Sequence, residues 1–277
     1  MKVVGHHGES YIFLTGIEIE DAISLGEGVD LTPADTSHID IHSALAACNS
    51  QADIPSIVSF IPLITAQFKI NAKNPKQSSI LAWNATWDAI LLSAILNSEI
   101  CFNIQSDTNA NLINSKSSLR SITHFMHGYP GSKPHKVTPE ERIWIIENFD
   151  NARNLLGNER FRTAIHCLAT YRWHSLPRIK LAVIWSGIES IFGIQSEIRF
   201  RLSINIARFL HLNNEENRKS IFDSVKNLYT IRSKAVHGEK LKSDISNIVT
   251  ESSELLRTII IKSIEQRSIP DENLLIP

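Results

Sequence analysis

An arginine and a histidine, Arg232 and His237, are the residues of this chain best suited to chemistry. Arginine can hold two phosphate oxygens at once, and histidine exchanges a proton near neutral pH because its unperturbed pKa is about 6.5. Together they could stabilise charge and move a proton during cleavage of a phosphodiester. Arg232 also lies among apolar residues that recur at steps of three and four, the pattern of a buried helix face. That face comprises Ile221, Phe222, Val225, Leu228, Tyr229, Ala235 and Val236.

The spacing of this pair is a weak indication by itself. The same loose pattern, an arginine and a histidine separated by four to six residues, occurs at two other places, Arg120 with His127 and Arg160 with His166. Five steps along a helix rotate a side chain by about 140°, so Arg232 and His237 converge only where the helix ends or bends near the histidine. Gly238 permits such an ending. The structural alternative is that Arg232 pairs with a carboxylate inside a helical bundle and His237 completes the helix C-terminus.

Glu189 is a second charged residue on an apolar helix face. It aligns with Ala182, Trp185 and Phe192 at steps of three, four and seven. A carboxylate in such a place needs a partner. Two interpretations follow: a structural ion pair with Arg232 or a nearby arginine, or a carboxylate that orients a catalytic arginine. Both place Glu189 near the site, and neither makes it a nucleophile.

Basic residues are concentrated around the same segment. Residues 199–240 contain nine Lys and Arg against four Asp and Glu. A basic face could hold an RNA backbone, and its affinity would then fall steeply with salt. The candidates for RNA contacts are Arg199, Arg201, Lys234 and Lys240. The alternative is that these side chains lie scattered on exposed helix faces and serve solubility.

The elements that must position these residues are helices. Thr138 to Glu141 combine a capping hydroxyl, a proline at the first helical position and a glutamate three residues after the cap. Helices are predicted over residues 139–156, 158–173, 178–193, 197–211, 215–236 and 243–267. Because the connections between them are short, the sequence predicts an antiparallel helical bundle over residues 138–277.

Residues 1–137 are predicted to form a smaller α+β region that precedes the bundle. Because the bundle is the larger part, the fold class of the whole chain is predicted to be mainly α. Strands are expected at 11–15, 17–20 and 100–105, a short helix over 38–47 and a buried helix over 78–96. The apolar run 57–70 fits either a helix or a strand. Residues 106–137 are rich in Ser, Asn, Gly, Pro and Lys, which indicates a loop or linker. The role of this region is unknown, with sensing and regulation as the options.

Composition limits the class of protein. The 277 residues carry a formal net charge of −1 with a pI near 6.8, which excludes a uniformly basic nucleic-acid binder. The three cysteines are widely spaced and form no C-x-x-C motif, which argues against a disulfide framework or a zinc site. The N-terminus lacks the apolar core of a signal peptide, and the most apolar run, 89–96, is too short to span a membrane. We therefore expect a cytoplasmic protein without membrane contact.

Three blocks of sequence, in this order, resemble the HEPN superfamily and, more narrowly, its Apea-like branch. They are residues 181–193 (LAVIWSGIESIFG), residues 197–203 (EIRFRLS) and residues 228–238 (LYTIRSKAVHG). The resemblance extends over roughly residues 140–265, about half of the chain. It implies a helical bundle that dimerises so that two Arg-x4-6-His motifs face each other across one cleft. Arg232 and His237 match that motif, and Ser233 occupies its often polar second position.

The resemblance also implies a function. Many such proteins are endoribonucleases that need no metal or other cofactor and act in toxin, antiphage or abortive-infection systems. One His237 would take the proton of the RNA 2′-hydroxyl while its counterpart in the second copy protonates the leaving oxygen. The family contains members that bind without cutting, so the alternative is a non-catalytic nucleotide- or RNA-binding module that acts with a defence partner. A third possibility is a buried dimer network of Arg232, His237 and Glu189 with no ligand.

Overall fold

The computed structural model describes residues 8–122, 133–194, 196–239 and 244–271. The chain folds into two compact units, Met1–Asp150 and Asn151–Pro277, which we call the N-terminal unit and the helical unit. The division lies inside helix α4 (Pro139–Leu155) rather than at residues 137 and 138. The N-terminal unit is therefore the longer of the two, not the smaller as expected.

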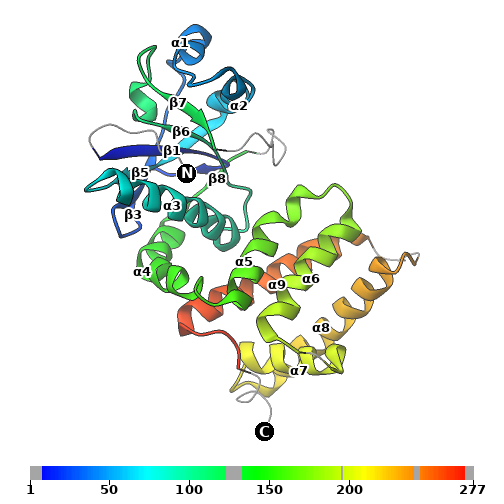
Figure 1. The fold of residues 1–277 in the computed structure, drawn as a ribbon. Helices are drawn as coiled ribbons and strands as arrows, with labels where there is room; N and C mark the ends of the chain where they lie inside the picture. Colours follow the sequence, from blue (N-terminus) through cyan, green and yellow to red (C-terminus); the bar gives the residue numbers. More distant parts are fainter. Residues whose placement is uncertain (1–7, 123–132, 195, 240–243, 272–277) are drawn as a thin grey trace. The chain divides into compact units, whose positions relative to one another are not determined.

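A six-stranded antiparallel sheet forms the centre of the N-terminal unit, in the order β3-β4-β5-β1-β6-β7 (Figure 1). Its strands are β1 (Glu9–Thr15), β3 (Ile23–Ser24), β4 (Val29–Pro33), β5 (Ile64–Asn71), β6 (Cys101–Ser106) and β7 (Leu119–Ser121). The central strand β1 pairs with β5 from Glu9 opposite Asn71 to Thr15 opposite Ile64. Five consecutive residues of β1, Ser10 to Leu14, are buried, because both faces of the sheet are covered. A separate parallel pair joins β2 (Ile17–Glu18) to β8 (His135–Lys136).

Helices cover the two faces of this sheet. Helix α3 (Pro75–Ile95) packs against β1, β5 and β6, whereas α2 (Ile54–Phe60) packs against β6 and β7 and against α1 (Ile41–Ala46). Figure 1 shows α3 and the α1–α2 pair on opposite sides of the sheet. On the α1–α2 side, Tyr11 and Phe13 of β1 join the buried cluster that includes Ile57 and Phe60. Asn74 begins α3, since its side chain accepts a hydrogen bond from the amide of Gln77.

The expected strands at 11–15, 17–20 and 100–105 and the helices over 38–47 and 78–96 are confirmed in place, although β2 and α1 are shorter than expected. The run 57–70 contains both kinds of structure, because α2 passes through a 3-10 turn with Pro62 into β5. The expectation of a loop over 106–137 is wrong in part. That segment contains the 3-10 turn Ala110–Leu112, β7 and β8, and Leu119 is fully buried. Its polar composition signals turns, but it does not reveal the pairing of β7 with β6.

The helical unit is a bundle, and its helices match the predicted ranges to within about three residues. They are α5 (Glu159–Thr170), α6 (Pro177–Phe192), α7 (Ile198–Leu210), α8 (Glu215–Val236) and α9 (Ile245–Gln266), with a 3-10 turn Tyr171–Trp173 after α5. Ahead of them, α4 begins as expected, because the Thr138 hydroxyl accepts from the Glu141 amide and the Glu141 carboxylate accepts from the Thr138 amide. Among the residues in the described ranges, no helix is long and apolar enough to cross a membrane.

Helix α6 lies at the centre of the bundle and packs against α5, α8 and α9 (Figure 1). Its residues Leu181, Ile184, Trp185 and Ile188 are fully buried. Gly187 makes the close approach possible, since a Cβ atom there would lie 2.9 Å from both Cβ of Cys167 and Cδ2 of Leu256. The face of α6 that carries Trp185 also carries Glu189. The packing of this face therefore fixes the position of the Glu189 carboxylate.

Candidate functional site

Helix α8 ends where the sequence predicts. Gly238 adopts the left-handed conformation with φ of +84°, which a residue without a Cβ accepts readily. The amide of Gly238 donates to the carbonyl of Ala235 (3.2 Å) and the amide of Glu239 donates to that of Lys234 (3.0 Å), the pair of bonds of a Schellman ending. His237 is the C-cap residue, and its side chain is exposed. The helix therefore presents this histidine to solvent.

Arg178, in the first turn of α6, holds the same helix end. Its Nη1 donates to the carbonyl of Ala235 (2.9 Å) and its Nη2 to the carbonyl of Glu239 (3.0 Å). These two carbonyls bracket His237, so one guanidinium fixes the backbone on both sides of it. A cation there is also favoured by the negative end of the helix dipole. Figure 1 shows the start of α6 beside the end of α8.

Arg178 is a residue that sequence reasoning misses. It contacts a carbonyl 57 positions later in the chain, and no local pattern marks that pairing. The only signal is its place directly after Pro177, at the start of a predicted helix. That signal locates a helix end but not what lies against it.

The ion pair expected for Glu189 is present, and its partner is Arg232. Nη2 of Arg232 lies 3.3 Å from Oε1 of Glu189, and the two side chains are 19% and 27% exposed. The buried Nε of Arg232 finds no hydrogen-bond acceptor within the part of the chain that the structure describes. The guanidinium is thus held at one edge by a carboxylate and retains donor capacity at another.

An aromatic ring packs against the guanidinium of Arg232. Cζ of Arg232 lies 5.5 Å from the centroid of the Tyr229 ring, within the range of a cation–π contact. The Tyr229 ring meets the fully buried indole of Trp185 edge to face, with centroids 5.3 Å apart. The Trp185 Nε1–H donates to Oγ of Ser252 on α9 (3.1 Å). The position of Arg232 therefore depends on contacts that extend from α8 through α6 to α9.

The Tyr229 hydroxyl lies in the electrostatic field of this ion pair. Burial raises its pKa above the ordinary value, and the negative charge of Glu189 and a hydrogen bond to that carboxylate raise it further. The Arg232 charge acts in the opposite direction. No pattern in the sequence marks this phenol as part of the cluster beyond its place on the apolar face.

Replacing Glu189 by Gln is expected to lower the pKa of Tyr229. The substitution removes the negative charge that opposes formation of the phenolate, and the Arg232 charge that favours the phenolate remains. The measurement is an NMR titration of ring-labelled tyrosine, with Tyr229→Phe to assign the resonance. Glu216→Gln, a change of an exposed carboxylate in the first turn of α8, is the matched control. An unchanged or higher pKa in the Glu189→Gln protein would contradict the described contact.

The other predicted site residues within the described ranges lie outside the contacts given above. Ser233 is half-buried and its carbonyl accepts from the His237 amide (3.1 Å), whereas Lys234 is exposed. Lys240 lies outside the described residues. Val236, expected on the apolar face, is 43% exposed because the helix ends there. Within one chain, the side chains of Arg232 and His237 differ in exposure. That of Arg232 is largely buried in the bundle, whereas that of His237 is exposed.

Arg199 and Arg201 lie on α7, toward the other end of α8. The intervening Phe200 packs edge to face on Phe222, with centroids 5.9 Å apart. Phe222 precedes Arg232 by ten residues, which is about 15 Å along a helix axis. Arg199 is exposed, and Nη1 of Arg201 donates to Oγ of Ser196 (3.0 Å). An RNA strand that touched these arginines and His237 would have to follow the length of α8.

The site contains no arrangement suited to a metal ion in the described ranges, where no three His, Cys, Asp or Glu side chains lie close enough together to hold one. Its chemistry is that of a guanidinium, a carboxylate, a phenol and a nearby imidazole. A scan against protein-family models finds no match to this chain. A search of curated proteins and a search of solved structures find none either.

Proposed function

We propose that this protein is an endoribonuclease that cleaves RNA through its own 2′-hydroxyl, without a metal, in a site formed by two copies of the chain. The observation that carries the proposal is the end of α8. An exposed histidine is held there by backbone contacts on both sides, and a partly exposed arginine, paired with Glu189, lies one and a half turns before it. Cleavage of a phosphodiester requires these two functions, proton transfer and neutralisation of phosphoryl charge.

The proposed reaction uses two histidines. The neutral imidazole of one His237 takes the proton from the 2′-hydroxyl, and the 2′-oxygen attacks phosphorus. The bond from phosphorus to the 5′-oxygen breaks, and the protonated His237 of the second copy gives that oxygen its proton. The products are a 2′,3′-cyclic phosphate and a 5′-hydroxyl, so neither water nor a redox partner is consumed. Arg232 would pair with the phosphoryl oxygens, with Glu189 and Tyr229 fixing its orientation.

A second copy is needed because one imidazole cannot act as base and acid in the same step. Apolar side chains near the end of α8 support contact there. Leu176 and Ile179 flank Arg178 and are 63% and 43% exposed, and Val236 directly precedes His237. Exposed apolar residues at the core of a patch, with polar groups at its rim, are typical of protein interfaces, and a twofold interface uses the same patch on both copies. A twofold axis at this place would bring two His237 side chains to one RNA strand.

The biological setting is proposed from the sequence resemblance alone. It favours an effector of a toxin, antiphage or abortive-infection system that acts on RNA in the cytoplasm. The N-terminal unit would sense a trigger or restrain the nuclease. A defence partner protein could take part in either role.

Mixing subunits tests the composite site. Wild-type protein and His237→Ala protein, combined in equal amounts and allowed to exchange, should retain about one quarter of the wild-type specific activity, because only one dimer in about four then has two histidines. Independent sites in each chain would leave about one half. The control is the same mixture with His38→Ala, an exposed histidine of the N-terminal unit, which should keep full activity.

The ends of the RNA fragments test the chemistry. The proposal requires 2′,3′-cyclic phosphate and 5′-hydroxyl ends in the presence of a metal chelator. Fragments with 5′-phosphate ends would contradict it. RNA that is bound, but not cut at any concentration of the wild type, would instead identify the non-catalytic binding module.

A further inference from the structure

A second cleft lies at the other end of α6. It is formed where α5 begins and where α6, α7 and α9 end, and it has a volume of about 840 Å³. Gly193, which ends α6, lines it and is fifteen residues from Arg178, or about 22 Å along a helix axis. The cleft is therefore separate from the site around His237. Its volume is within the range of small-molecule sites, roughly 300–1,000 Å³.

The lining of the cleft combines positive charge with an apolar wall. Among the residues that the structure describes, three cations line it, Arg160, Arg208 and Lys262, and one carboxylate, Asp271. The apolar part comprises Leu155, Phe192, Phe209, Leu212, Ile269 and Pro270. Phe192 and Phe209 meet edge to face with centroids 6.0 Å apart, so the two rings pack on each other in this wall. An anion with an apolar body would match both parts.

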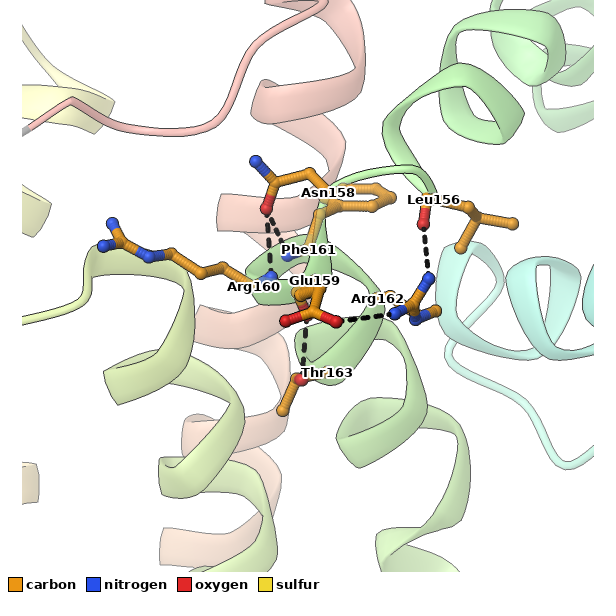
Figure 2. A network of polar contacts seen from close by, with 7 residues as sticks. All are labelled: Leu156, Asn158, Glu159, Arg160, Phe161, Arg162 and Thr163. Carbon is orange, nitrogen blue, oxygen red and sulfur yellow. Dashed lines mark hydrogen bonds and ion pairs between the residues drawn. The ribbon is translucent and has the colours of Figure 1, made fainter.

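Arg160 is the residue whose state most favours a ligand. Figure 2 shows its side chain extended away from the polar network at the start of α5. Within the described residues, its guanidinium makes no hydrogen bond or ion pair. Arg162, two positions later, is by contrast tied to the Leu156 carbonyl and to the Glu159 carboxylate, each at 3.4 Å (Figure 2). Lys262 also lacks such a partner within those residues.

A glycine allows the Arg160 guanidinium to lie where it does. A Cβ atom at Gly193 would be 2.5 Å from Cζ of Arg160, so any other residue there would displace the guanidinium. Gly193 also has a φ of +66°, which disfavours other residues. The backbone amides at the start of α5 are not the binding groups, because Oδ1 of Asn158 already accepts from Arg160 N (3.0 Å) and Phe161 N (3.3 Å). Side chains must carry the recognition.

We propose that this cleft binds a small organic phosphate. The Arg160 fork and the Lys262 ammonium would hold the phosphate oxygens, and the wall around Phe192 and Phe209 would cover the organic part. The ligand would contact four helices, α5, α6, α7 and α9, and so stabilise their packing. This inference does not depend on the proposed cleavage of RNA.

The test is calorimetric titration of the full-length protein with phenyl phosphate and with inorganic phosphate, at low salt. Phenyl phosphate should bind saturably and more tightly than inorganic phosphate. Arg160→Met and Lys262→Met should each weaken its affinity by about tenfold, the loss expected for one charge-assisted contact. Arg162→Met, which removes the same charge two residues away, should leave the affinity unchanged.

Three outcomes would overturn the proposal. They are the absence of saturable binding, equal affinities for the two probes, and an equal loss in the Arg162→Met protein. Thermal unfolding of each variant, with a midpoint close to that of the wild type, shows that a lost affinity is not a lost fold. Neither measurement involves RNA, so failure here and failure of the nuclease proposal are distinguishable.

Discussion

His237→Ala should reduce RNA cleavage by roughly 10²- to 10⁴-fold, the contribution typical of a general acid or base. Under the proposed mechanism the effect lies at the upper end, because each dimer loses its base and its acid together. The fold should be unaffected. The side chain is exposed, and the bonds that end α8 are made by backbone amides and by Arg178, which the substitution leaves in place.

The measurement is kcat/KM on a defined RNA, accompanied by the free energy of unfolding. His38→Ala is the control for loss of an exposed imidazole and should change neither quantity. Arg232→Lys adds a second comparison, since it keeps the charge but loses the fork that holds two phosphate oxygens. Cleavage by the His237→Ala protein at the wild-type rate would contradict the proposed mechanism. A loss accompanied by unfolding would assign the histidine a structural role instead.

Trp185→Ala should lower the free energy of unfolding by about 3–5 kcal/mol, the usual cost of deleting a large buried aromatic side chain. The indole is fully buried in the centre of the bundle, and its removal also leaves the Ser252 hydroxyl without its donor. Tyr229 would lose its edge-to-face contact, so Arg232 would lose its support as well.

Urea unfolding followed by circular dichroism measures this effect. Trp185→Phe should cost less than the alanine substitution, because it keeps most of the ring volume and loses only the hydrogen bond and the remaining area. Trp83→Ala removes the same side chain from a position that is 58% exposed, and we expect a change within about 0.5 kcal/mol. Equal losses at Trp83 and Trp185 would contradict the described packing.

The helical unit was predictable from sequence because its signals are local. Its helices have apolar stripes and defined ends, such as the glycines at 193 and 238. The pairing of Glu189 with Arg232 was also within reach, since a charge on each of two apolar faces requires a partner. The prediction that Glu189 and Arg232 pair required only that the helices form a bundle, and not the detailed geometry of that bundle.

The N-terminal unit was less predictable because its sheet is built from distant segments. The pairing of β1 with β5 joins residues some fifty to sixty positions apart, and β7 lies in a segment whose composition indicates only turns. The same limit applies to Arg178, whose role depends on a contact between α6 and α8. Trp83 illustrates a further limit, since it lies in the segment 78–96 that is predicted to be a buried helix and yet is 58% exposed.

The last turn of a helix commonly frays, because its final carbonyls lack partners inside the helix. At the end of α8 two such carbonyls are bound by Arg178, whose backbone belongs to a different helix. Opening this turn therefore also breaks two hydrogen bonds to a side chain of α6, and not only bonds within α8. Fraying of the last turn is then opposed by a contact from a neighbouring helix, which favours the helical conformation of the backbone around His237.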